Sequence, residues 1–267
     1  MHRYLKLLLL LIVPAFVLSP GAGAGTPEKR VALVIGNAAY KVKPPATAVN
    51  DAALVAQTVQ AAGFDVIGAR DLDEKLFRQV FHDFTEKVRN AGPNAVALVY
   101  FAGYGVQIEG ENYLVPVDAE IAESSTVAPH ALPLSEMIAA LAALRSKIFI
   151  ILDAARTPSL SGQPGGLAWI EPAPDMLIAF NTAPGTLARD TGEGYGAYAR
   201  ALAEMIREGE LTPAGVFDRV RLRVHELTKG AEIPWDASRI TGPFKFFERA
   251  TSAKVQRVEK LGRGAGA

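Results

Sequence analysis

The chain of 267 residues contains no cysteine. Without a thiol it can form no disulfide, no thiolate zinc site and no cysteine nucleophile. It also lacks an H-E-x-x-H motif or other paired metal-ligand spacing, and it has no G-x-S-x-G turn to present a catalytic serine. These absences exclude the usual zinc-peptidase and serine-hydrolase signatures, and no motif calls for a cofactor.

Neither sign of charge is in excess, because 28 Lys and Arg residues balance 28 Asp and Glu residues. A neutral chain lacks the basic footprint of a nucleic-acid-binding protein, so we expect no nucleic-acid partner. The hydrophobic content of 49% is enough for a sizeable core. A chain of this length can bury that core without disulfides.

The first 24 residues have the layout of a secretory signal peptide. A short basic segment precedes an apolar run from Leu7 to Leu18, and Ala22-Gly23-Ala24 fits a cleavage site. As a helix, the run would span about 18 Å, against roughly 30 Å of hydrocarbon core. We therefore expect cleavage, no stable membrane span afterwards, and a periplasmic or secreted location. The alternative is an uncleaved membrane anchor.

Strand-like and helix-like segments alternate after the leader. The apolar strands are continuous runs, which is typical of a parallel sheet covered by helices on both faces. The sequence thus predicts a three-layer α/β/α sandwich with a mostly parallel six-stranded sheet in one domain, 25–249, followed by a loose basic tail, 250–267. The predicted strands are 30–35, 64–67, 95–101, 147–152, 176–180 and 244–247.

The predicted helices begin at a cap on Asn50 and at Asp73, and three more cover 133–144, 197–207 and 213–227. The pattern 106–108 and 113–115 around Glu109-Gly110 predicts a hairpin. Ligands of open parallel sheets collect at the carboxyl ends of the strands. Two such ends are unusual here: FAGYG at 101–105 and LDAAR at 152–156.

Seven segments, in order, resemble the bacterial caspase-like proteins of the metacaspase and orthocaspase group. They are VALVIGNAAY (31–40), VNDA (49–52), LVYFAGYGVQ (98–107), NYLVPVDA (112–119), IFIILDAAR (148–156), APG (183–185) and IPWDASRITGPFKF (233–246). The resemblance covers about 30–247 and implies the caspase-like fold and a monomer. Related peptidases often need calcium, but no matched position carries that site over.

The resemblance also implies where a catalytic pair would lie. Active members carry a histidine and a cysteine at the positions of Tyr104 and Ala155. A methyl group cannot attack a carbonyl, and tyrosine, with a reference pKa of about 10, is a poor proton acceptor at neutral pH. We therefore expect a pseudopeptidase rather than an enzyme. Tyr104 would either fill the site or be a plain core aromatic.

Other parts of the family's site are kept. The resemblance places Asp51 and Asp153 in the pocket for a basic substrate side chain, and the backbone N–H groups of Gly105 and Ala155 as oxyanion donors. The alternative is that Asp51 caps its helix and Asp153 holds a loop. The expected partner is a peptide or protein with an exposed Arg or Lys.

Two other functions stay open. One is a weak Arg/Lys-directed endopeptidase with a relocated nucleophile, for which Ser159 or Ser161 would need activation by His82, His130 or His225. His82 and His225 are expected on helices, which leaves His130 in a loop. The other is a structural interaction module of the cell envelope, with the pocket as a relic.

Overall fold

The computed structural model describes residues 28–120, 124–156, 164–189 and 194–247. The predicted signal peptide, the predicted tail, Ser159 and Ser161 lie outside the described residues. Among the residues that are described, no helix combines the length and apolar character needed to cross a bilayer.

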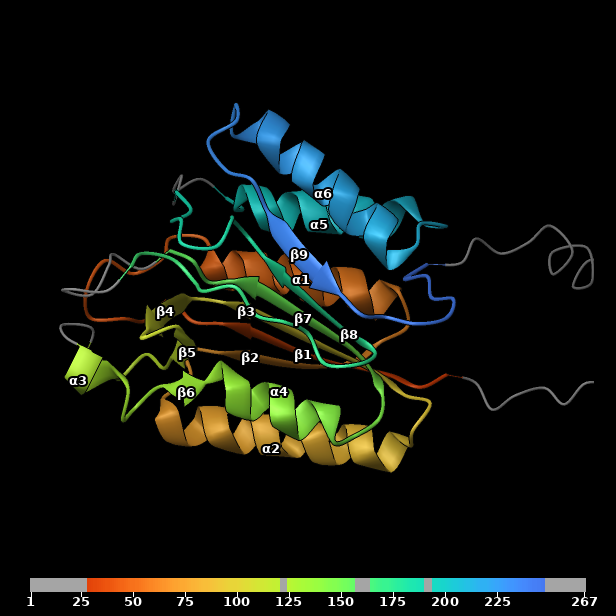
Figure 1. Cartoon of the computed structure of the whole chain (residues 1–267), viewed down its shortest axis with the longest axis horizontal. Coiled ribbons are helices and arrows are strands. Elements are labelled where there is room, and N and C mark those ends of the chain that lie inside the picture. The colour runs from red at the N-terminus through yellow and green to blue at the C-terminus, as the bar shows by residue number, and fades with distance from the viewer. Residues whose placement is uncertain (1–27, 121–123, 157–163, 190–193, 248–267) are drawn as a thin grey trace, which may run out of the picture.

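A six-stranded sheet forms the middle layer of the fold (Figure 1). Its strand order is β2-β1-β3-β7-β8-β9, in which β9 alone runs antiparallel to its neighbour. The four central strands are apolar runs buried along almost their whole length, as expected for a sheet covered on both faces. The strands are β1 (Arg30–Gly36), β2 (Asp65–Arg70), β3 (Val96–Ala102), β7 (Lys147–Asp153), β8 (Met176–Phe180) and β9 (Trp235–Ser238).

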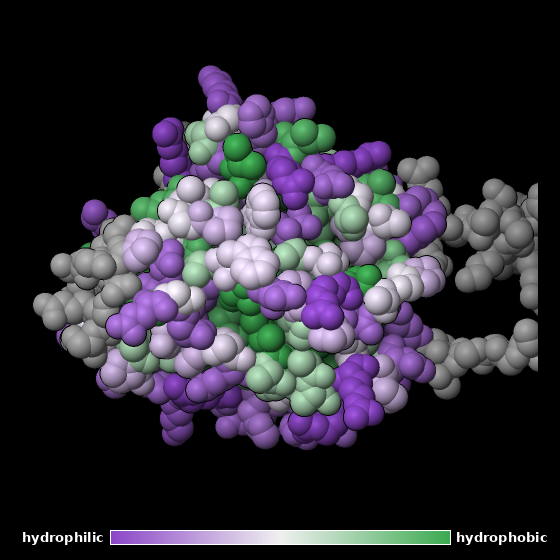
Figure 2. All heavy atoms as spheres, viewed as in Figure 1, coloured by the Kyte–Doolittle hydropathy of each residue, from purple (hydrophilic) through white to green (hydrophobic). Residues whose placement is uncertain are grey.

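Helices cover both faces of this sheet and complete the predicted three-layer α/β/α sandwich. On one side lie α1 (Ala48–Ala61), α5 (Ala197–Glu208) and α6 (Pro213–Leu227); on the other lie α2 (Glu74–Ala91) and α4 (Leu134–Ala142) (Figure 1). Each layer encloses its own hydrophobic core against the sheet. In Figure 2 hydrophilic residues predominate on the outer sides of both helix layers, with some hydrophobic residues among them in the upper layer, and hydrophobic residues show between the layers.

A small antiparallel sheet extends from the carboxyl edge of the main one. It consists of β4 (Tyr104–Ile108), β5 (Glu111–Val115) and β6 (Leu132–Pro133), and a four-residue helix, α3 (Ser124–Val127), precedes β6. The predicted hairpin is confirmed, with Glu109 at φ 52° and Gly110 at φ 85°. Two positive φ values define the tight turn that matches the twist of a two-stranded ribbon.

Two sequence predictions of local structure are wrong. The predicted last strand at 244–247 is irregular chain: Phe244 and Phe246 pack on Phe149, and Arg30 binds the carbonyl groups of Lys245 and Phe246. Alternating aromatics mimicked a strand, whereas the sixth strand is β9, about ten residues earlier.

The first helix also begins earlier than its predicted cap at Asn50. The helix starts at Ala48, with Thr47 in the cap position. The Thr47 hydroxyl donates to the Asp51 carboxylate at 2.7 Å instead of capping the helix backbone. The Asn50 side chain donates to the carbonyl of Gly194 at 3.0 Å. This end of α1 is thus shaped by contacts with a distant loop.

Candidate functional site

The two unusual strand ends lie side by side at the carboxyl edge of the sheet. Ala102, the last residue of β3, pairs with Asp153, the last of β7. Beyond the strands, the N–H group of Gly105 donates to the carbonyl of Ala154 at 2.8 Å. Positions 104 and 155 therefore flank one hydrogen bond, and the fold brings together the two positions that the resemblance singled out.

Tyr104 is a packed aromatic residue in this structure. Its ring lies 4.4 Å from that of Tyr40, centroid to centroid, and its side chain is buried. Its hydroxyl donates to the carbonyl of Lys43, and its N–H donates to the Tyr40 hydroxyl at 3.0 Å. Tyr104 therefore holds the 42–43 loop at the position for which the resemblance implies a histidine.

Ala155 is buried and its backbone is held on both sides. Its N–H donates to the Asn181 side chain at 3.2 Å, and its carbonyl accepts from the N–H of Ala188 at 2.7 Å. Since the Gly105 N–H is bonded to Ala154, both expected oxyanion donors are engaged within the chain. The structure thus differs from the expectation that these two N–H groups act as oxyanion donors, because Ala154 and Asn181 already accept their hydrogen bonds.

Asp51 and Asp153 converge although they lie on different elements. Asp51 is in the first turn of α1, Asp153 ends β7, and both side chains are fully buried. The guanidinium of Arg156 lies between them, with Nη2 at 2.9 Å from Asp51 Oδ2 and 2.6 Å from Asp153 Oδ1. Its Nη1 donates to the Thr47 hydroxyl at 2.7 Å. We call the cluster of Asp51, Asp153, Thr47 and Arg156 the acidic pocket; its two acids hold a basic side chain of the same chain.

Each carboxylate also has partners other than Arg156. Asp51 Oδ1 accepts the N–H of Gly196 at 2.6 Å, so it holds the start of α5 rather than capping its own helix. Asp153 accepts from the Tyr100 hydroxyl and the Asn181 amide, each at 2.9 Å. Hydrogen bonds from the sheet and from the start of α5 therefore hold the two carboxylates in place.

The pocket keeps a negative balance, with two carboxylates around one guanidinium. Burial raises the pKa of Asp51 to about 6, and the nearby Asp153 charge adds to this, while Arg156 opposes it. Burial alone would lower the pKa of Arg156, but the charges of Asp153 and Asp51 outweigh it and raise the pKa. Arg156 therefore stays protonated, and Asp51 titrates at a pH of about 6.

The titration of Asp51 predicts a pH dependence of stability. An acid whose folded pKa of about 6 exceeds its ordinary value of 3.8 binds its proton more tightly when folded, so this contribution is lost as pH rises from about 4 through 6. The shift corresponds to the order of 2–3 kcal/mol. Asp51→Asn should flatten urea-unfolding stability between pH 4 and 7 relative to the original chain. An unchanged slope would contradict the raised pKa.

Gly196 forms a wall of the pocket where no side chain fits. A Cβ there would lie 2.9 Å from Asp51 Oδ2 and 3.0 Å from Arg156 Nη2. Gly196→Ala is therefore expected to lower the free energy of unfolding by about 1–3 kcal/mol. Gly68→Ala is the matched control, since nothing lies within 4 Å of its Cβ position. Equal melting temperatures of the two variants would contradict the prediction, because they would show that the pocket has room for a methyl group at position 196.

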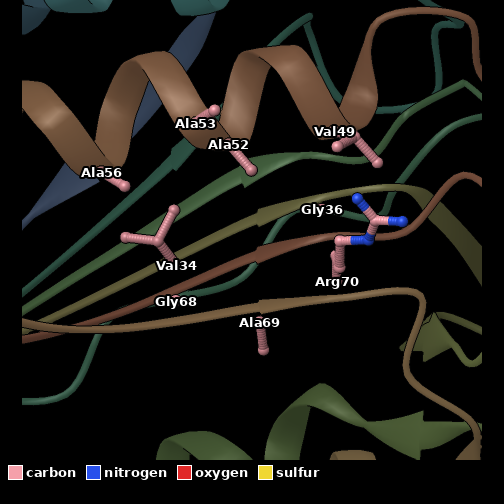
Figure 3. A pocket seen from close by; sticks show the side chains of 9 residues that line it. All are labelled: Val34, Gly36, Val49, Ala52, Ala53, Ala56, Gly68, Ala69 and Arg70. Carbon is pink, nitrogen blue, oxygen red and sulfur yellow. The ribbon is translucent and has the colours of Figure 1, made fainter.

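A separate groove of about 380 Å³ lies between α1 and the strands β1 and β2 (Figure 3). Small side chains and two glycines line most of it, and Arg70 is the only charged residue in its lining. Neither acid of the pocket nor positions 104 and 155 contribute to it. The groove has none of the groups needed for acyl transfer, so the candidate site is the strand edge instead.

Histidines do not supply a replacement base in the described residues. His82, His130 and His225 are all exposed, and the Nδ1 atom of His130 lies 3.1 Å from a Glu74 carboxylate oxygen. Across the part of the chain that the structure describes, no three His, Asp or Glu side chains are placed to hold a metal ion. The charged groups that the structure does bring together at the strand edge are two carboxylates and one guanidinium.

Sequence reasoning missed the residues that complete the pocket. The sequence analysis assigned no role to Arg156. A cation three residues after a buried acid could have indicated an ion pair with Asp153. Asn181 directly follows β8, and its position at the carboxyl end of a strand could have indicated a site residue. Thr47 and Gly196 gave no signal, because only the tertiary fold brings Thr47 to Arg156 and Gly196 to Asp51.

Comparison with protein families agrees with this geometry. The model of the caspase domain, peptidase family C14, matches residues 29–245, which is most of the chain. A comparison with curated proteins found no match. With the sheet order, the helix layers and the two strand ends in place, the chain belongs to the caspase domain family.

Proposed function

We propose that this protein is an exported, catalytically inactive caspase-like domain that works by binding a basic side chain of a peptide or protein. The observation that carries the proposal is a guanidinium held by Asp51 and Asp153 beside Ala155. Arg156 provides an example of the ligand chemistry that this pair of acids accepts. The basic and apolar N-terminal sequence supports export.

The absence of a nucleophile supports binding without cleavage. Ala155 offers no electron pair, and the Tyr104 hydroxyl is committed to the backbone of residue 43. In a serine protease, loss of nucleophile and base costs on the order of 10⁶ in turnover. No contact of the described residues favours a relocated nucleophile over this proposal.

The pocket's charge favours a cation from outside. With Asp51 and Asp153 ionised, Arg156 leaves one negative charge uncompensated. Glu232, also buried, lies near enough for Asp153 and Arg156 to affect its pKa, which burial raises. A buried excess of negative charge attracts Arg and Lys over neutral side chains.

The test compares two peptides that differ by one group. The purified protein is titrated with an extended peptide carrying arginine and with the same peptide carrying citrulline, which has the same length and no charge. We expect weak binding of the arginine peptide, a clear preference over citrulline, and intact peptide by mass spectrometry afterwards. Equal binding, no binding, or a cut peptide would each contradict the proposal.

A further inference from the structure

Arg156 has the contacts of a bound ligand. All three guanidinium nitrogens donate hydrogen bonds, to Asp51, Asp153 and Thr47, at 2.6 to 3.1 Å. Its side chain is 6% exposed. A planar, forked cation between two carboxylates is the arrangement that proteins use to recognise arginine. Here, however, the arginine belongs to the residue that directly follows Ala155.

The two carboxylates of the pocket also accept hydrogen bonds from groups other than Arg156. Gly196 and Thr47 bind Asp51, while Tyr100 and Asn181 bind Asp153. Burial and the charges of Asp153 and Asp51 raise the pKa of Tyr100 well above its ordinary value, so its hydroxyl stays protonated as a donor. These four hydrogen bonds do not involve the guanidinium, so they would still orient the carboxylates if it left. A preorganised site binds a replacement ligand at little cost in ordering.

We propose that Arg156 is an internal ligand that closes a guanidinium-binding pocket, and that an arginine side chain from outside enters only by displacing it. This inference rests on the proposed function, because the displacing group is the partner's basic side chain. A closed pocket lowers the apparent affinity by the fraction of molecules that are open. An open fraction of about 1–10%, usual for a minor state, corresponds to about 10- to 100-fold weaker binding.

The experiment removes the internal ligand and measures the affinity for the outside one. The arginine and citrulline peptides are titrated into the original protein and into Arg156→Ala, Arg156→Lys and Arg221→Ala. Arg156→Ala should bind the arginine peptide about 10- to 100-fold more tightly than the original chain, and citrulline no better. Arg156→Lys keeps a cation in the pocket and should stay closed. Arg221 on α6, which binds Asp236 of β9, is the matched control, and its replacement should leave both peptide affinities unchanged.

Folding of the Arg156→Ala variant is a second readout, because two buried acids lose their cation. If the variant unfolds easily, the arginine peptide should raise its melting temperature in a concentration-dependent manner, and the citrulline peptide should not. A melting temperature that responds equally to both peptides would overturn the inference.

The outcomes separate the inference from the proposed function. Equal affinity of the original chain and Arg156→Ala would overturn the internal ligand but leave the binding function standing. Tight binding by Arg156→Ala, with no arginine preference in the original chain, would support the internal ligand and contradict the proposed function. A folded Arg156→Ala that binds no arginine would overturn both.

Discussion

Replacing Tyr104 with histidine and Ala155 with cysteine is expected to restore a reactive thiol without restoring cleavage after arginine. A thiol beside an imidazole supplies nucleophile and base. The acidic pocket, however, is filled by Arg156, and the amides of Gly105 and Ala155 are bonded within the chain. Loss of even one oxyanion donor costs about 10²–10³ in turnover. Iodoacetamide labelling measures the thiol, and fluorogenic Arg substrates measure cleavage.

Adding Arg156→Ala to the double variant should then produce slow cleavage of Arg substrates, because the pocket is open to the substrate side chain. Citrulline substrates should stay intact, and Ala155→Cys alone is the control for a thiol without a base. Saturable cleavage by the double variant, at a rate that Arg156→Ala does not increase, would contradict a pocket closed by Arg156.

Asp153→Asn should be among the most destabilising single changes at this site. Asp153 is fully buried and accepts hydrogen bonds from Tyr100, Asn181 and Arg156. An asparagine would lose the charge and direct an amide donor toward other donors. Breaking a buried ion pair from one side costs about 3–5 kcal/mol. For a domain of this size, that is a fall in melting temperature of about 6–20 °C.

Asp65→Asn is the control for this prediction. Asp65 pairs with Lys87 at 2.8 Å, but the two side chains are 64% and 39% exposed. Exposed pairs contribute about 1 kcal/mol or less. Comparing the melting temperatures of the two variants under the same conditions shows how much of the loss comes from burial of the ion pair rather than from pairing alone. A similar small loss for both would mean that Asp153 and Arg156 are not tightly coupled.

The sheet and its helix layers were predictable because each strand and helix is specified by the pattern of apolar residues within its own segment. Continuous apolar runs such as 96–102 and 148–152 are typical of strands buried between two helix layers, and the chain alternates between such runs and amphipathic helices. The predicted helix start at Asp73 is also confirmed, since its side chain accepts a hydrogen bond from the backbone of its own helix. The strand predicted at 244–247 failed because the same alternation serves an irregular segment packed by aromatic contacts.

The pair of acids was predictable, but its occupant was not. The resemblance placed Asp51 and Asp153 in one pocket, and the structure brings the two carboxylates to one guanidinium. Nothing in the sequence states that the side chain of Arg156 turns back between them rather than toward solvent. That choice depends on Thr47 and Gly196, which are 109 and 40 positions away along the chain. Tertiary contacts of this kind have no local pattern.

The direct test of a binding-only role is hydrolysis by the purified, unchanged protein. Fluorogenic Arg and Lys substrates are incubated with the original chain, with Asp153→Asn, and with Ser159→Ala and Ser161→Ala. The account predicts no release above the buffer blank in any sample. Steady cleavage after Arg or Lys by the original chain, abolished by one of these substitutions in a folded variant, would contradict it.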